Sequence, residues 1–169
     1  MSSLPLSLGQ HAPDFTLVSK TAEGPQRITL SDSLKKGPTL LLFFPMIFTR
    51  VCTEEFCSLS LEFHSYCELG VNVYGISGDN PFAQEAWAQQ EKIIVPLLSD
   101  YEHEVAQAYG IAYQSFLPDH HLGMRGVPKR AAFIINQAGV IEDVQWSDDP
   151  TILPDFEKIK RILTSLKTL

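Results

Sequence analysis

Long hydrophobic runs and clustered positive charge are both missing from this sequence of 169 residues. No segment approaches the roughly 20 consecutive apolar residues of a membrane-spanning helix. The start of the chain lacks the basic region and apolar stretch of a secretory signal, so we expect a cytoplasmic protein with no membrane partner. The formal net charge is -7 and the basic residues are dispersed, which argues against nucleic acid as a partner.

Cysteine is also scarce, with three residues in the whole chain: Cys52, Cys57 and Cys67. Their spacing is neither the dispersed even set of a disulfide-rich secreted protein nor the paired CxxC of a zinc ribbon. In a reducing compartment we expect them to be thiols. A structural zinc site or interaction module stays open as an alternative from another class. GxGxxG and GxxxxGK[ST] are absent as well, so no nucleotide cofactor is expected.

The chain length suits one buried core, and we expect a single domain over residues 1–169. Apolar runs alternate with helical patterns, which predicts an α/β sandwich, and a glycine turn over 136–139 predicts an antiparallel hairpin, so the sheet should be mixed. We expect Phe82 and Trp87 to pack a helix against this sheet. The predicted strands cover 15–18, 39–44, 71–76, 132–135 and 140–146, and the predicted helices cover 49–69, 81–92, 103–109 and 154–166.

The segment FFPMIFTRVCTEEFC, residues 43–57, changes abruptly from a buried strand to a polar helix start. Pro45 ends the strand, and if Thr49 is the N-cap, Cys52 takes the third helical position, where backbone N–H groups have no helical acceptor. The helix dipole and a nearby guanidinium would both favour thiolate over thiol. Cys52 is therefore a candidate nucleophile, and the alternative is a small buried apolar residue.

Several motifs together resemble one known family. Pro45-x-x-x-Thr49-x-x-Cys52 matches the PxxxTxxC signature of the peroxiredoxins, and the remaining landmarks follow in the expected order: APDF at 12–15, VYGIS-D at 73–79, Trp87, and Arg130-x-x-Phe133-x-Ile135. The resemblance implies a thioredoxin-like fold. It also implies a thiol-dependent peroxidase that reduces hydrogen peroxide or alkyl hydroperoxides through a cysteine sulfenic acid.

The resemblance assigns roles by motif position. Cys52 becomes the peroxidatic cysteine, Thr49 and Arg130 its polar partners, and Pro45 a shield that also serves as a strand terminator. The fixed fork of N–H donors on an arginine suits both a sulfur and the peroxide oxygens, which a lysine would not match. Glu55 has two readings that stay open: a carboxylate that steadies the arginine, or an ordinary first-turn carboxylate serving the helix dipole.

Two other arginines compete with Arg130 for the guanidinium role. We expect Arg50, at the start of the helix, to face solvent. Arg125 lies in a glycine-containing loop over 123–126, whereas Arg130 enters a strand that should run beside the strand-to-helix segment. Arg130 is therefore the preferred candidate.

A sulfenic acid must condense with a thiol before further peroxide over-oxidises it. Cys57 follows Cys52 by five residues, a spacing that resembles the branch named for bacterioferritin comigratory protein. In an intact helix the two Cα atoms would lie about 8.6 Å apart, beyond the ~7 Å limit for a disulfide, so the helix must unwind. The residues around Cys52 look more like the one-cysteine and typical two-cysteine branches. The resolving thiol is therefore Cys57, Cys67 or an external thiol.

The partners implied by the resemblance are a peroxide substrate and a thioredoxin-like or other thiol reductant. The branches of the family differ as monomers, dimers and rings, so a homodimer is one of the open assemblies. No metal or organic cofactor is implied.

Overall fold

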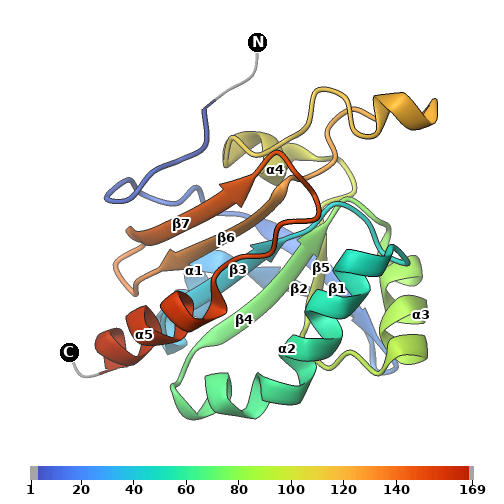
Figure 1. Cartoon of the computed structure of the whole chain (residues 1–169). Coiled ribbons are helices and arrows are strands. Elements are labelled where there is room, and N and C mark those ends of the chain that lie inside the picture. The colour runs from blue at the N-terminus through green and yellow to red at the C-terminus, as the bar shows by residue number, and fades with distance from the viewer. Residues whose placement is uncertain (1–3, 168–169) are drawn as a thin grey trace.

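The computed structural model describes residues 4–167, and its strands and helices alternate along most of the chain (Figure 1). The strands are Thr16–Thr21 (β1), Gly24–Thr29 (β2), Thr39–Phe43 (β3), Asn72–Ser77 (β4), Leu97–Ser99 (β5), Arg130–Ile135 (β6) and Ile141–Ser147 (β7). The helices are Leu30–Lys36 (α1), Arg50–Glu68 (α2), Pro81–Glu91 (α3), Glu104–Ala108 (α4) and Phe156–Lys167 (α5), with a short 3-10 turn at Pro118–His120.

The strands form one mixed sheet in the order β2-β1-β5-β4-β3-β6-β7. Strand β4 is the central strand, and β3 lies next to it, parallel to β4 and antiparallel to β6. The predicted hairpin is present: β6 and β7 pair antiparallel, and Gly139 adopts a left-handed φ of 82° in the turn between them. The α/β class and the mixed sheet predicted from the sequence are therefore confirmed.

Two buried clusters cover the two faces of the sheet. Successive residues of β3 point to opposite faces, so Leu40 and Leu42 enter the cluster beneath α2, α3 and α5. Leu41 and Phe43 enter the cluster beneath α1 and α4. Figure 1 shows α2 and α5 in front of the sheet and α1 and α4 behind it. Because β3 is buried on both faces, its residues 40–43 are continuously apolar rather than alternating.

Some elements escaped the sequence prediction. Strand β2 contains a glycine, a proline and an arginine and lies at the sheet edge, where such residues are tolerated. Strand β5 has only three residues, too few for a periodic pattern, and the short helix α1 was also missed. The expectation for Phe82 was wrong: it is 70% exposed near the start of α3, whereas Trp87 is fully buried.

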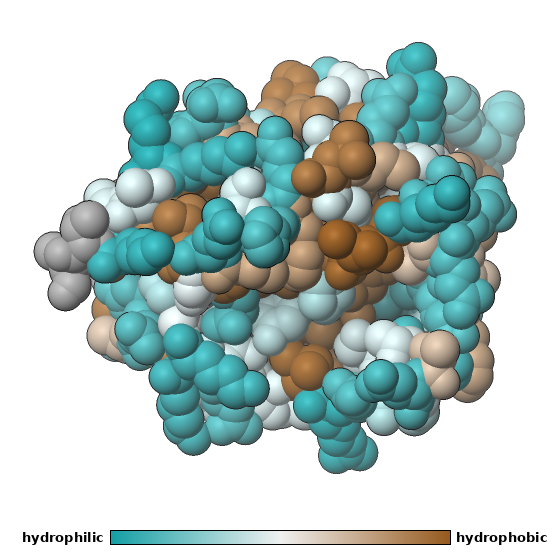
Figure 2. Space-filling model, turned by 90° about the horizontal axis from the view of Figure 1, so that it is seen from below, coloured by the Kyte–Doolittle hydropathy of each residue, from teal (hydrophilic) through white to brown (hydrophobic). Residues whose placement is uncertain are grey.

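The surface seen from below is largely hydrophilic, with separate apolar patches between polar and charged side chains (Figure 2). Among residues 4–167, no helix is both long enough and apolar enough to cross a membrane.

Candidate active site

The turn between β3 and α2, residues 44–49, is called the elbow here. Pro45 is buried in it, and Phe48 adopts a left-handed backbone with φ of 61°, which is unusual for a bulky residue. Helix α2 begins at Arg50 with Thr49 as its N-cap, as predicted. The Thr49 side chain does not cap the helix; its Oγ1 donates to the Met46 carbonyl at 2.6 Å. The elbow thus folds back on itself through Thr49.

Cys52 occupies the third position of α2 and is 1% exposed. Strand β6 pairs beside β3, with Ala131 opposite Phe43, so Arg130 arrives at the elbow as predicted. Its Nη2 donates to Cys52 Sγ at 2.9 Å, and its Nη1 donates to Glu55 Oε2 at 2.9 Å. One guanidinium therefore joins the sulfur to a buried carboxylate.

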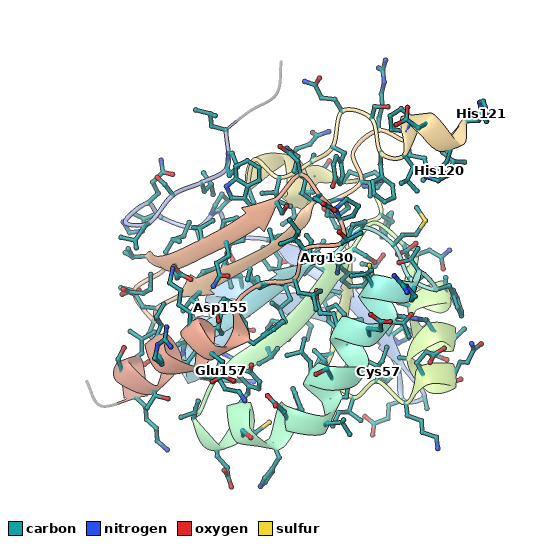
Figure 3. The ribbon with its side chains drawn as sticks, viewed as in Figure 1. Cys57, His120, His121, Arg130, Asp155 and Glu157 are labelled. Carbon is teal, nitrogen blue, oxygen red and sulfur yellow. The ribbon has the colours of Figure 1, made fainter. Side chains whose placement is uncertain are left out.

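A third acceptor fixes Arg130 from the far side. Its Nε donates to the Pro150 carbonyl at 2.9 Å, in the segment between β7 and α5. Figure 3 shows Arg130 near the start of α2, between that segment and the helix. With donors engaged in three directions the guanidinium plane has little freedom to rotate. Its orientation toward the sulfur is built into the fold.

Burial and charge act against each other in this cluster. Burial raises the pKa of Glu55 from 4.5 to about 7, although the charge and hydrogen bond of Arg130 act to lower it. The second carboxyl oxygen, Oε1, is buried and accepts no hydrogen bond from any residue that the structure describes. Burial disfavours the charged form of Arg130, yet the neighbouring Glu55 and Cys52 raise the pKa of Arg130. Of the two readings for Glu55, the geometry matches the one that steadies the arginine.

The two other arginine candidates, Arg50 and Arg125, are not buried against the sulfur. Arg50 is exposed, as predicted, and Arg125 is exposed at the edge of a cavity that also touches Pro45. His120 and His121 sit at the tip of a protruding loop, far from Arg130 (Figure 3). Over residues 4–167, no three histidine, cysteine, aspartate or glutamate side chains are grouped as a metal site would require.

The three cysteines are free thiols in the described part of the chain. Cys57 is partly buried, and its sulfur donates to the Glu91 carbonyl of α3 at 3.6 Å. Burial and the nearby Glu91 carboxylate raise the pKa of Cys57. Cys67 is exposed near the opposite end of α2. Because α2 is unbroken from Arg50 to Glu68, Cys52 and Cys57 are not in bonding position here.

Comparisons with known proteins decide the family. The AhpC/TSA family model matches residues 8–144. This chain belongs to that family. A peroxiredoxin from Thermoplasma volcanium is 34% identical over 171 residues, covering 97% of this chain and 76% of the relative. A chloroplastic 2-cysteine peroxiredoxin from Chattonella marina var. antiqua is 33% identical over 144 residues, covering 81% of this chain and 69% of the relative.

Solved structures agree with this placement. The crystal structure of peroxidoxin BcpB from Mycobacterium tuberculosis superposes with a TM-score of 0.77 at 27% identity, covering 97% of this chain and 98% of that one. The present peroxiredoxin therefore has a thioredoxin-like fold and is a thiol peroxidase, as its sequence motifs implied.

Sequence reasoning missed several groups that shape the site of this peroxiredoxin. Met46 and Pro150 contribute only backbone carbonyls, so residue type carries no signal for them. Asp79 was noted as part of a motif, but no contact with the elbow was predicted for it. In the structure its carboxylate accepts a hydrogen bond from the Ile47 N–H of the elbow at 3.0 Å. One available signal was its position two residues after β4, the parallel neighbour of β3.

Proposed function

We propose that Cys52 is the peroxidatic cysteine of a thiol peroxidase that reduces hydrogen peroxide and small alkyl hydroperoxides. One observation carries this proposal: the Arg130 guanidinium donates to Cys52 Sγ at 2.9 Å and is held by Glu55 on its other side. A cation fixed against a sulfur favours the thiolate, which is the nucleophilic form.

In the first half-reaction the Cys52 thiolate attacks one peroxide oxygen. A sulfur–oxygen bond forms and the oxygen–oxygen bond breaks, so the sulfur is oxidised to sulfenic acid and the substrate leaves as water or an alcohol after taking up a proton. Negative charge builds on the leaving oxygen in the transition state, where fixed donors are most effective. An arginine has five N–H donors, and three of those on Arg130 are occupied, which leaves two for the peroxide.

Thr49 and Pro45 complete the proposed site. Thr49 Oγ1 donates its hydrogen bond to the Met46 carbonyl, so its lone pairs are free to accept a hydrogen bond from the peroxide. Pro45 is buried in the elbow and would exclude water from the sulfur. Since Cys52 is only 1% exposed, a substrate must displace neighbouring atoms to reach it, which favours small peroxides.

For the second half-reaction we propose Cys57 as the resolving thiol. It would attack the Cys52 sulfenic acid to form a disulfide and release water. A thioredoxin-like dithiol would then reduce that bond. The first turns of α2 must unwind for this step. The same unwinding would break the Cys57 hydrogen bond to the Glu91 carbonyl, and it would relieve the burial and the proximity to the Glu91 carboxylate that raise the pKa of Cys57. Resolution by an external thiol is the second candidate, favoured by the intact helix between the two cysteines.

Three free thiols suit a reducing compartment, and we propose the cytoplasm as the location. For the assembly, we propose a homodimer, which is one of the forms found among the branches of the family.

The deciding experiment replaces Cys57 with serine and follows both one stoichiometric peroxide reduction and turnover with a thioredoxin-like reductant. If Cys57 resolves, the single reduction survives at the wild-type rate while turnover stops. Unchanged turnover would assign resolution to an external thiol. Cys67→Ser is the matched control, because this thiol is exposed near the far end of the same helix. Loss of the first reduction in Cys52→Ser is required by the proposed function.

A further inference from the structure

We propose that Asp79 is a positioning residue for the Cys52 reaction: its carboxylate holds the elbow in the conformation that the chemistry requires. The inference rests on the proposed role of Cys52. Asp79 lies between β4 and α3, outside the elbow and outside the Cys52–Arg130–Glu55 cluster.

The contacts of Asp79 connect the elbow to the sheet. Its Oδ2 accepts from the Ile47 backbone N–H at 3.0 Å and from the Ser77 hydroxyl at 2.8 Å. Ser77 is fully buried at the end of β4, and its hydroxyl also accepts from Gln84 Nε2 at 2.9 Å. The Asp79 carbonyl in turn accepts from the Ser99 hydroxyl at 2.5 Å. Asp79 is thereby fixed to the ends of two sheet strands, to β4 through its carboxylate and to β5 through its backbone carbonyl.

Packing holds only part of the elbow: the Ile47 side chain is buried in the cluster beneath α2, but the residue that follows it is not. Phe48 has a left-handed backbone, a conformation that persists only where surrounding structure enforces it, and its side chain is 54% exposed. A cavity of about 370 Å³ opens behind the elbow and is lined by Pro45, Met46 and Asp79, among others. Packing therefore holds the elbow least at Phe48, and the hydrogen bond from the Ile47 N–H to Asp79 fixes the backbone just before that residue.

The far end of the elbow has its own anchor. The Thr53 hydroxyl donates to the Thr49 carbonyl at 2.7 Å, and Trp87 Nε1 donates to that hydroxyl at 3.2 Å. Ile47 lies between Met46 and Thr49, so moving Ile47 would displace the Met46 carbonyl and turn the Thr49 hydroxyl that it orients. Asp79 thus acts on the reaction through the elbow without touching the substrate.

The test separates the acceptor role of Asp79 from its charge and from general stability. Asp79→Asn keeps an oxygen that can accept from Ile47, whereas Asp79→Ala removes it. Each reduced variant is mixed rapidly with hydrogen peroxide at a temperature where circular dichroism shows it folded, and the rate constant of the first oxidation is measured. Asp14→Ala and Asp14→Asn are matched controls, since Asp14 Oδ1 accepts backbone N–H groups of Phe15 and Ser31 at 3.0 and 2.9 Å, at the start of α1.

We expect Asp79→Ala to lower the rate constant about 10- to 100-fold, because a displacement near 1 Å has effects of this order. Asp79→Asn should stay within about threefold of wild type, and both Asp14 variants should be unchanged. Amide hydrogen exchange at Ile47 should accelerate in Asp79→Ala and stay slow in Asp79→Asn, a readout that a loss of global stability would not confine to this residue.

Three results would overturn the inference: an unchanged rate in Asp79→Ala, an equal loss in both Asp79 variants, or slow Ile47 exchange in all of them. If Asp79→Ala does not fold, Ser77→Ala removes one donor to the same oxygen and should lower the rate by a few-fold, with an unchanged rate counting against the inference. Failure of the wild-type Cys52 to react at all would instead contradict the proposed function. The two failures are thus distinguishable.

Discussion

At the scale of single residues, the site depends on the shape of one guanidinium. Arg130 reaches Cys52, Glu55 and the Pro150 carbonyl through three different nitrogens. A lysine carries the same charge on one nitrogen and cannot span these three acceptors. We therefore expect Arg130→Lys to lower the rate constant of Cys52 oxidation by about 100-fold or more, in line with the loss of one preorganised donor in other enzymes. Stopped-flow mixing of the reduced protein with hydrogen peroxide measures this rate constant.

The matched control is Arg125→Lys, which changes an exposed arginine on the neighbouring loop and should leave the rate within about twofold. Comparable rates for Arg130→Lys and the wild type would show that charge alone suffices, contrary to the geometry described here.

A second residue-scale prediction concerns Glu55. Since burial raises the pKa of Glu55 from 4.5 to about 7, the folded protein binds more protons than the unfolded chain between these pH values. The free energy of unfolding should therefore fall as pH rises through this window, by roughly 3 kcal/mol from this group at most. Glu55→Gln should remove that part of the slope. Urea denaturation at pH 5 and pH 8 tests it.

The prediction concerns the difference in pH dependence of the unfolding free energy between wild type and Glu55→Gln. Burial also raises the pKa of Asp100, which adds the same pH dependence to both proteins. Glu54→Gln, an exposed change of the same type on the same helix, is the control. Parallel pH profiles for wild type and Glu55→Gln would contradict the prediction.

At the scale of elements, the proposed resolution step requires the first turns of α2 to unwind. Ser58 is exposed and lies within the stretch whose hydrogen bonds must open for Cys57 to reach Cys52. Glycine is about 0.5 kcal/mol worse than serine in a helix interior, so Ser58→Gly should speed disulfide formation about twofold without changing the rate of Cys52 oxidation. Quenched-flow thiol labelling measures the disulfide rate.

Ser65→Gly is the matched control, since the same substitution lies farther along α2, beyond the segment that must open. It should lower stability and leave the disulfide rate unchanged. Equal acceleration by both substitutions would mean that the whole helix opens rather than its first turns.

Elements also show how far the sequence could predict this protein. The strand over 39–44 and the helix over 49–69 were placed to within one residue, because a buried apolar run and a proline mark the boundary between them. The contact between Arg130 and Cys52, which the resemblance to the family implied, is present as a hydrogen bond, and the catalytic roles of the two residues stay a prediction. Strand β2 lacked any apolar pattern, and the anchoring of the elbow by Asp79 depends on strand order, which no local pattern encodes.

At the scale of the whole molecule, the two hydrophobic clusters lie on opposite faces of one sheet, and both include residues of its strands. Leu41 and Leu42 are adjacent in β3 yet belong to opposite clusters, so loss of β3 would open both clusters at once. We propose that residues 1–169 form a single domain and expect one cooperative unfolding transition. Urea transitions followed by far-UV circular dichroism and by tryptophan fluorescence should coincide, with Trp87 reporting on the cluster beneath α2. Two separated transitions would contradict a single domain.

The most direct measurement treats the reduced protein with one equivalent of hydrogen peroxide at neutral pH and maps the oxidised sulfur by mass spectrometry with a sulfenic-acid trap. If exposure governed reactivity, Cys67 would react first, because it is the exposed thiol and Cys52 is 1% exposed. We predict the opposite: trapped sulfenic acid or a disulfide at Cys52, with Cys67 still reduced. Oxidation of Cys67 while Cys52 stays a thiol would contradict the claim that Arg130 activates the buried sulfur.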